Sequence, residues 1–162
     1  MKRTPQLLLP AAAALLLAGC AGGGTPADPG GPSEPAPRPS PSGPPEQVIA
    51  EVTGLAPPES AEDLSAETEY TDDGRLLLRA FFRTDRAGAE AFCDAENLGV
   101  YRDPEGPSEE DREAHGAEEE TVDGSATCRG TEPDEGRVQR DVLVLYPGQD
   151  EAAVYVSAVE VE

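Results

Sequence analysis

A long stretch near the N-terminus contains almost nothing that can form a hydrophobic core, and it limits how much of this chain can fold. From Ala21 to about Glu46 the residues are nearly all Gly, Pro, Ser and Ala, and no apolar side chain is larger than alanine or proline. Such a segment buries too little surface to offset the entropy lost on ordering. The sequence therefore predicts a disordered linker over 20–46 and a folded part over 47–162.

The residues before this linker have the parts of a secretory signal peptide. Two cations near the N-terminus are followed by an apolar run from Leu7 to Ala18, and small residues come next. The run contains Pro10 and is shorter than the roughly 20 residues that a helix needs to cross a hydrocarbon core, so a retained membrane span is not expected. Residues 1–19 are predicted to be a leader that is removed on export.

The end of the apolar run indicates how this leader is removed. Leu17, Ala18, Gly19 and Cys20 follow one another there, and they resemble the lipobox of bacterial lipoproteins position by position. The resemblance implies that the Cys20 sulfur receives a diacylglyceryl group, that cleavage occurs directly before it, and that it becomes the acylated, palmitate-bearing N-terminus. Two acyl chains hold a protein stably at a membrane. Ordinary secretory cleavage followed by release is the alternative.

The order of lipobox, Pro/Gly stalk and one compact domain resembles that of small lipoproteins of unknown function in high-GC Gram-positive bacteria. The resemblance implies a lipid anchor on the extracytoplasmic face of the cell membrane. It implies no activity, and no functional residue other than Cys20. An extended linker would hold the folded part up to about 80 Å from its anchor. A Pro-rich recognition peptide is the alternative interpretation of the linker.

The charge of the chain restricts its partners. The formal net charge is −21, and removal of Lys2 and Arg3 with the leader takes the mature protein to about −23. Binding to nucleic acid requires cationic groups that neutralise phosphates, so nucleic acid is not an expected partner. The electrostatic field favours cationic ligands or basic exported proteins.

Residues 47–162 contain several strand patterns and one helical pattern. Apolar residues alternate over 75–83, a turn sequence precedes them at 72–74, and 64–70 is the predicted hairpin partner. Residues 138–146 and 152–161 are predicted to form a second hairpin, and 124–129 a further strand. A short helix is predicted from a cap at Thr84 to near Gly99.

Together these elements predict an α+β fold in a single small domain. The predicted architecture is an antiparallel sheet of about four or five strands with one helix packed on a face, after a disordered Pro/Gly-rich tether. Strand 75–83 has a mixed second face that carries Leu77, Arg79, Phe81 and Arg83. This face is interpreted either as a binding surface for an acidic or aromatic partner or as an ordinary exposed sheet face.

Two cysteines remain once Cys20 is acylated. Cys93 lies on the predicted helix and Cys128 near the end of a predicted strand. An even pair in an oxidising compartment predicts a disulfide. It would close a loop of about 36 residues and stabilise the domain by roughly 3 to 4 kcal/mol on the chain-entropy model. A reactive thiol or a metal pair is the alternative, but neither cysteine has a neighbouring histidine or a C-x-x-C spacing.

The most acidic part of the chain runs from Asp103 to Glu120, and it includes His115, the only histidine. Like charges this close disfavour compact packing, so a mobile excursion is predicted. A calcium site is the alternative, but the D-x-[DN]-x-[DN]-G loop is not present and no metal site is predicted. A pH-sensing role for His115 is the alternative to a solvated side chain without a fixed partner.

The sequence contains none of the motifs G-x-S-x-G, S-x-x-K or H-E-x-x-H, and no Gly-rich phosphate loop. No catalytic residue and no cofactor are therefore predicted. The leading hypothesis is a non-catalytic binding or accessory module of the cell envelope that contacts another exported protein or a cationic ligand. The alternatives are a small envelope hydrolase, which needs paired carboxylates with one raised pKa, and a substrate-binding lipoprotein of a transporter.

Overall fold

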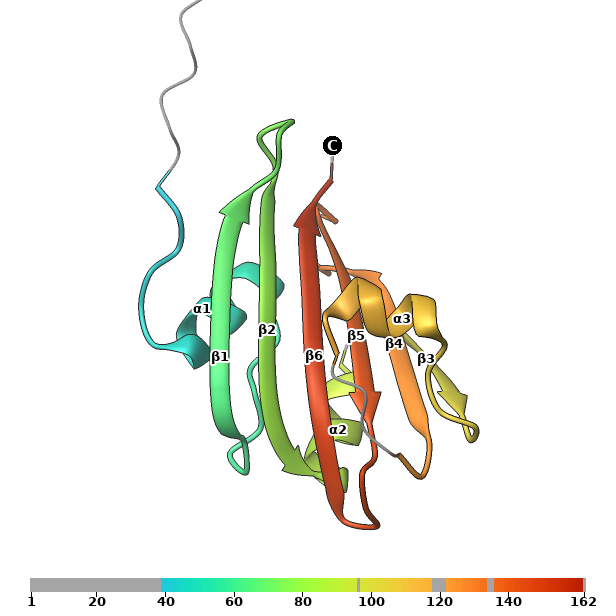
Figure 1. Ribbon diagram of the computed structural model, residues 1–162. Coiled ribbons are helices and arrows are strands. Elements are labelled where there is room, and N and C mark those ends of the chain that lie inside the picture. The colour runs from blue at the N-terminus through green and yellow to red at the C-terminus, as the bar shows by residue number, and fades with distance from the viewer. Residues whose placement is uncertain (1–38, 96, 118–121, 134–135, 162) are drawn as a thin grey trace, which may run out of the picture. The chain divides into compact units, whose positions relative to one another are not determined.

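The computed structural model describes residues 39–95, 97–117, 122–133 and 136–161 (Figure 1). These residues contain three helices and six strands. The helices are α1 (Pro45–Thr53), α2 (Arg86–Cys93) and α3 (Glu109–His115). The strands are β1 (Glu62–Tyr70), β2 (Leu76–Asp85), β3 (Leu98–Asp103), β4 (Ser125–Thr131), β5 (Val138–Leu145) and β6 (Glu151–Glu160).

All six strands form one antiparallel sheet in the order β1-β2-β6-β5-β4-β3. β1 and β2 form one hairpin, and β5 and β6 form another, as the sequence predicts. β6 lies between β5 and β2 and joins the two halves of the sheet (Figure 1). The predicted fold class, a single α+β domain on an antiparallel sheet, is confirmed.

The alternation in β2 explains why the sheet has two unlike faces. Leu78 and Phe82 point to one side and are fully buried. The register places them opposite Ala158 and Val154 of β6, which are also buried. Because side chains alternate with a period of two, the same pattern continues through β5 and β4. One side of the sheet, here called the first face, is therefore a continuous apolar surface.

Two helices, α1 and α2, cover the first face (Figure 1). α1 buries Val48, Ile49 and Val52 against it. α2 brings the ring of Phe92 edge-on to that of Phe82, with the centroids 5.2 Å apart. Full burial of a side chain of this size stabilises a fold by roughly 1.5 to 3 kcal/mol, so most of the apolar stabilisation lies on this side.

The N-terminus of α2 is capped by Asp85, whereas the sequence analysis assigned the cap to Thr84. The Asp85 carboxylate accepts a hydrogen bond from the backbone N–H of Gly88 at 2.6 Å. Thr84 does not cap the helix, because its hydroxyl pairs with that of Ser60 at 2.8 Å. Asp85 therefore satisfies one of the free N–H groups of the first turn.

The end of α2 differs from the prediction, which extended the helix to near Gly99. The helix stops at Cys93, and Asn97 adopts a left-handed backbone with φ 63°. A residue in that conformation reverses the chain direction. Leu98 then begins β3, a sixth strand that was assigned to the helix.

The second face of the sheet has a smaller core. Leu143, Leu145 and Ala153 are fully buried there, and Tyr155 is nearly so. α3 lies across this face, in front of β6 and β5 in Figure 1. The two faces are therefore covered by different helices.

α3 lies within the stretch for which a mobile excursion was predicted, and for residues 109–115 that prediction was wrong. The Ser108 hydroxyl caps the helix by accepting a hydrogen bond from Asp111 N–H at 3.1 Å. Gly116 ends it with φ 62°. The three acidic residues of the first turn lie at the positive end of the helix dipole, which offsets their mutual repulsion. Residues 118–121 of the same stretch lie outside the described residues.

Candidate binding surface

Among the described elements, none covers the β1–β2 side of the second face. We call this region the open half-face. Its residues are Ser65, Glu67 and Glu69 of β1 and Leu77, Arg79, Phe81 and Arg83 of β2. The pairing of β1 with β2 places Glu67 beside Arg79 and Ser65 beside Phe81. The predicted mixed face of β2 therefore exists, and it is continued by an acidic neighbouring strand.

The centre of the open half-face is aromatic. The rings of Phe81 and Tyr155 lie 5.0 Å apart at an angle of 53°. The Arg83 guanidinium carbon is 5.8 Å from the centre of the Phe81 ring, within the range of a cation–π contact. Arg79 Nη1 donates to Glu69 Oε1 at 3.1 Å. The arginines are thus held by neighbours and leave part of an aromatic surface accessible.

A hollow of about 240 Å³ lies between this aromatic surface and the C-terminal end of α3. We call it the His115 hollow. It is lined by Ser65, Glu67, Arg79, Ala80, Phe81, His115, Gly116 and Tyr155. Drug-sized ligands occupy pockets of roughly 300 to 1,000 Å³, so this hollow is smaller than a typical small-molecule pocket.

A second depression, lined partly by glutamates, adjoins the His115 hollow. This depression, of about 390 Å³, is lined by Glu67, Thr68, Glu69 and Arg79. It shares Glu67 and Arg79 with the His115 hollow. A side chain that enters the hollow therefore meets carboxylates on the β1 side.

α3 is connected to the second face by a cluster of four polar side chains, here called the α3 cluster. Arg129 of β4 bonds to Asp111 Oδ1 at 3.0 Å and to Asp141 Oδ2 at 2.9 Å. His115 Nε2 is 3.4 Å from Asp141 Oδ1, and its Nδ1 is 2.9 Å from the Asp111 carbonyl oxygen. The His115 side chain is 1% exposed. The expectation that this histidine has no fixed partner was wrong.

The charges of the α3 cluster shift the pKa values of its members. Burial disfavours the charged form of His115, but the interactions with Asp141 and with the Asp111 carbonyl outweigh it and raise the pKa of His115 above 6.5. Burial also works to raise the pKa of Asp141, but the interactions with His115 and Arg129 outweigh it and lower that pKa below 3.8. The cluster therefore stabilises a protonated imidazole next to an ionised carboxylate.

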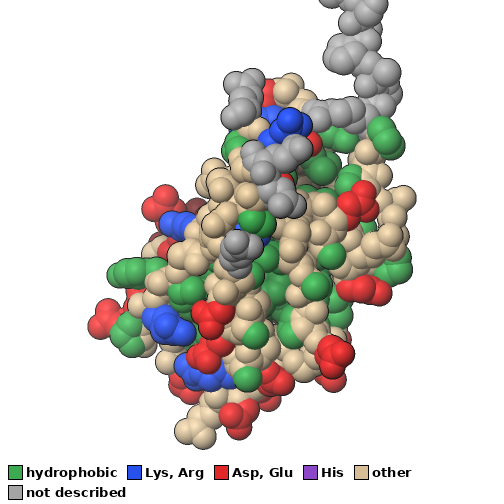
Figure 2. Space-filling view, turned by 180° about the vertical axis from the view of Figure 1, so that it is seen from behind, with side chains coloured by type: hydrophobic (Ala, Val, Ile, Leu, Met, Phe, Trp, Pro, Cys, Tyr) green, Lys and Arg blue, Asp and Glu red, His purple; other side chains and the backbone are tan. Residues whose placement is uncertain are grey.

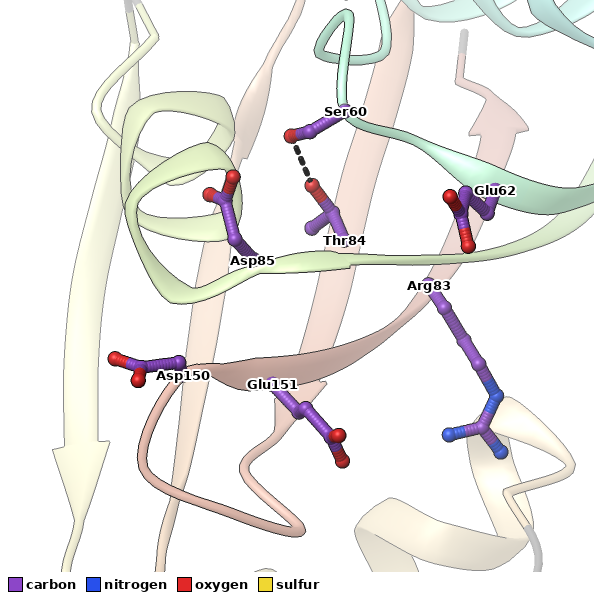
Figure 3. A pocket seen from close by; sticks show the side chains of 7 residues that line it. All are labelled: Ser60, Glu62, Arg83, Thr84, Asp85, Asp150 and Glu151. Carbon is purple, nitrogen blue, oxygen red and sulfur yellow. Dashed lines mark hydrogen bonds between the residues drawn. The ribbon is translucent and has the colours of Figure 1, made fainter.

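A larger depression, of about 420 Å³, lies at the end of the sheet where β1 and β6 begin (Figure 3). It is lined by Ser60, Glu62, Arg83, Thr84, Asp85, Asp150 and Glu151. Four of these residues are acidic and one is cationic. The Asp85 carboxylate is already engaged with α2, and the Ser60 and Thr84 hydroxyls with each other. Acidic side chains also gather at this lower end when the domain is viewed from behind (Figure 2).

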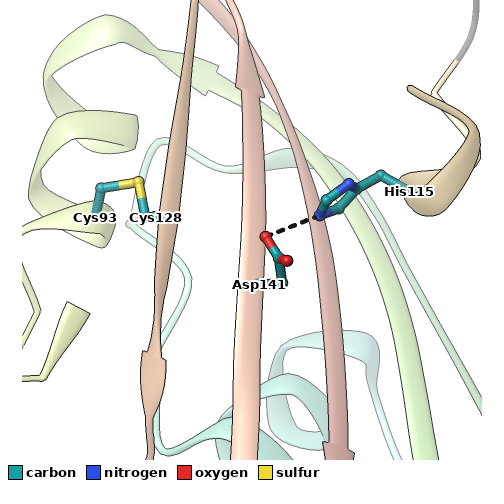
Figure 4. The surroundings of a disulfide bond; sticks show 4 residues. All are labelled: Cys93, His115, Cys128 and Asp141. Carbon is teal, nitrogen blue, oxygen red and sulfur yellow. Dashed lines mark ion pairs between the residues drawn. A yellow bond between two sulfur atoms is a disulfide. The ribbon is translucent and has the colours of Figure 1, made fainter. Parts of the chain in front are cut away.

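The disulfide predicted between Cys93 and Cys128 is confirmed. Their Cα atoms are 5.6 Å apart, and both residues are buried on the first face. The bond ties the last residue of α2 to β4. Figure 4 shows this bond and the pair of His115 and Asp141 on opposite sides of the sheet. The sheet therefore carries one helix tied covalently and another tied by charges.

Two described carboxyl groups bear on the paired-carboxylate alternative. A carboxyl that acts as a general acid needs a raised pKa. Asp141 and Asp73 have clearly shifted pKa values, and both are lowered, Asp73 chiefly by a hydrogen bond from Thr71. In the part of the chain that the structure describes, no three His, Cys, Asp or Glu side chains converge as metal ligands.

Several predicted residues cannot be placed. Leu17, Ala18, Gly19 and Cys20 lie outside the described residues, as do the leader and the linker as far as residue 38. The acidic residues 118–120, part of the stretch for which a calcium site was the alternative interpretation, also lie outside them.

The sequence analysis overlooked one residue with an important structural role, Arg140. It is 1% exposed, and it donates to the backbone carbonyl oxygens of Thr53, at 3.3 Å, and of Thr131. Burial lowers its pKa. Arg140 therefore joins β5 to the C-terminal end of α1. A charged residue between Val138 and Val142, at an inward position of a strand, was the available indication.

A comparison of the chain with protein-family models, curated proteins and solved structures found no match. Among the helices of residues 39–161, none in the described ranges has the length and apolar character that crossing a bilayer requires.

Proposed function

We propose that this protein is a lipid-anchored binding module of the cell envelope, and that it contacts another exported protein through the open half-face. The observation that carries the proposal is the accessible surface of Phe81, packed against Tyr155 at a tilt and flanked by arginines, beside a hollow of side-chain size. Aromatic residues and arginine are the side chains that contribute most to protein interfaces.

The charge of the molecule supports a basic partner. The formal net charge of the full sequence is −21, and removal of the two cations of the leader takes the mature chain to about −23. Glu67 and Glu69 border the aromatic surface, and an acidic depression adjoins it near Arg83. A basic protein is attracted to such a surface over long range, and a protruding arginine or lysine finds both aromatic rings and carboxylates there.

Two observations support the extracytoplasmic location. The lipobox at Leu17–Cys20 follows an apolar leader directly. The disulfide between Cys93 and Cys128 agrees with an oxidising compartment, where such bonds persist. The lipid on Cys20 would hold the module at the membrane while the linker gives it reach.

Site-specific photo-cross-linking on the membrane-anchored protein tests the interface. A photoreactive amino acid at Leu77, on the open half-face, is expected to form a covalent adduct with one exported protein. The matched control is Glu51, an exposed position of α1 on the other side of the sheet. Phe81→Ala is expected to lower the Leu77 adduct about tenfold, as removal of a central interface residue does.

Equal adducts from Leu77 and Glu51, or none from Leu77, would refute the interface. Circular dichroism of Phe81→Ala separates a lost contact from a lost fold. High salt is expected to reduce the adduct yield, because a basic partner is steered by charge.

A further inference from the structure

α3 has an unusual attachment for a helix that covers part of a core. His115 is its only buried residue, and its single apolar side chain, Ala114, is exposed. The apolar residues of the second face are instead packed by Ala117 and Val122, which follow the helix, and by Phe81 of β2. A seven-residue helix is also marginal by itself. Its position therefore depends mainly on the α3 cluster.

The partners of the two ring nitrogens of His115 determine which protonation state of the ring the α3 cluster favours. A carbonyl oxygen only accepts hydrogen bonds, so Nδ1, 2.9 Å from the Asp111 carbonyl, carries a proton. If the ring is neutral, Nε2 has a lone pair instead, and that lone pair faces Asp141 Oδ1 at 3.4 Å. Two acceptors then oppose each other at a site that water hardly reaches. Only the doubly protonated ring attracts both partners.

The balance of charge leads to the same conclusion. With a protonated His115, the cluster has two positive groups, His115 and Arg129, and two negative ones, Asp111 and Asp141. Loss of the proton leaves one uncompensated negative charge. The other charged groups near the ring are Arg79 and Glu67, which line the same hollow, and Arg79 is engaged by Glu69. Neither of them replaces the lost charge.

We propose that α3 is a lid, latched onto the second face by the α3 cluster, and that it opens when His115 loses its proton. Opening exposes the apolar residues Leu143, Leu145 and Tyr155 and removes one wall of the His115 hollow. The lid is independent of the identity of any partner, because the latch lies wholly within the domain.

The direction in which pH affects the lid follows from the shifted pKa values of His115 and Asp141. The pKa of His115 is raised in the closed form, so the latch is complete below about pH 6.5 and is lost as the pH rises through the higher value. The pKa of Asp141 is lowered, so its contribution is present above pH 3.8 and is lost as the pH falls through its lower value. The lid is therefore closed at mildly acidic pH and opens as the pH rises through the raised pKa of His115.

NMR and hydrogen exchange on the full-length protein test the proposal. His115 is the only histidine, so a titration yields one imidazole signal, with an expected midpoint above 6.5. Between about pH 5 and pH 9, exchange corrected for intrinsic rates is expected to show the protection of residues 109–117 falling roughly fivefold or more, a usual size for coupled conformational changes. Amides of β2 keep their protection and report that the sheet is intact.

Three variants sharpen the test. In His115→Gln, the protection of α3 is expected to be low and independent of pH. In Asp141→Asn, the imidazole midpoint is expected to fall. The matched control is Glu90→Gln, which breaks the ion pair with Arg86 on α2, away from the latch, and leaves both readouts unchanged.

The proposal is overturned by a midpoint at or below 6.5, or by α3 protection that does not vary with pH in the unmodified protein. The proposal is also overturned if the protection of α3 depends on pH in His115→Gln as strongly as in the unmodified protein. Joint loss of protection in α3 and β2 indicates global unfolding and also excludes a local lid.

Discussion

Gly130 is the residue at which the structure leaves least room for a side chain. A Cβ at this position of β4 would overlap the backbone carbonyl of Asn97, at the entry to β3. Backbone cannot move aside as the end of a flexible side chain can. The β3–β4 pair therefore requires glycine here because two backbones approach closely.

Gly130→Ala is expected to destabilise the domain by about 2 to 4 kcal/mol, the range of a severe steric conflict in a packed structure. Urea unfolding followed by circular dichroism measures it. Gly99→Ala is the matched control on β3, because the nearest atom to its Cβ would be the Arg129 carbonyl oxygen at an ordinary 3.7 Å. A similar midpoint for both variants would contradict the close approach.

The partner of His115 could not be predicted from the sequence around it. Its own neighbours in the chain are polar and small, which is typical of a solvated loop. The group that determines its charge, Asp141, comes 26 positions later and on another strand, so only the pairing of strands brings the two together. Local patterns contain no information on such a contact. Arg140 was detectable in principle, because it interrupts an apolar alternation.

The disulfide acts at the scale of elements, because it fixes α2 to β4. Cys93 and Cys128 are 35 positions apart, and the helix between Asp85 and Cys93 is short. Without the bond, α2 would be held by noncovalent contacts alone, such as those of Phe92 and Ala89 with the first face and of Arg86 with Tyr146. The disulfide should therefore matter most for this helix.

The double variant Cys93→Ala with Cys128→Ala is expected to lose about 3 to 4 kcal/mol of unfolding free energy. Hydrogen exchange should show the largest loss of protection in α2 and a smaller loss in β2. Addition of a reductant serves as the control, since it should destabilise the original protein and leave the double variant unchanged. An unchanged unfolding midpoint in the variant would show that the bond contributes nothing.

The elements that the sequence predicted are those with local patterns. Both hairpins follow from alternation next to turn residues, and their pairing needs no distant information. β3 was missed because Leu98–Asp103 contains a glycine and two charged residues and pairs only through β4. α3 was missed because its acidic composition outweighed a recognisable cap, Ser108 with Asp111 three positions on, and the terminating Gly116.

At the scale of the whole molecule, the proposed anchor decides where the domain operates. Cys20→Ala is expected to remove the lipid and shift the protein from the membrane fraction to the soluble fraction, because no second anchor is proposed. Mass spectrometry of the unaltered protein should find a diacylglyceryl group on residue 20 and no residue before it. Ser33→Ala, in the linker, is the control and should stay with the membrane. An unmodified thiol at Cys20 would refute the lipid anchor.

β6 follows the other five strands along the chain, yet it lies inside the sheet. A polypeptide that emerges in order, from a ribosome or a translocation channel, therefore displays the β1–β2 hairpin and the β3–β4–β5 group before the strand that unites them exists. Until β6 (Glu151–Glu160) emerges, β2 and β5 each have one edge whose backbone N–H and C=O groups are unpaired. In nascent chains of this topology the edge of β2 stays open to intermolecular pairing while residues 86–150 are delivered, and the sheet is completed only once β6 has emerged.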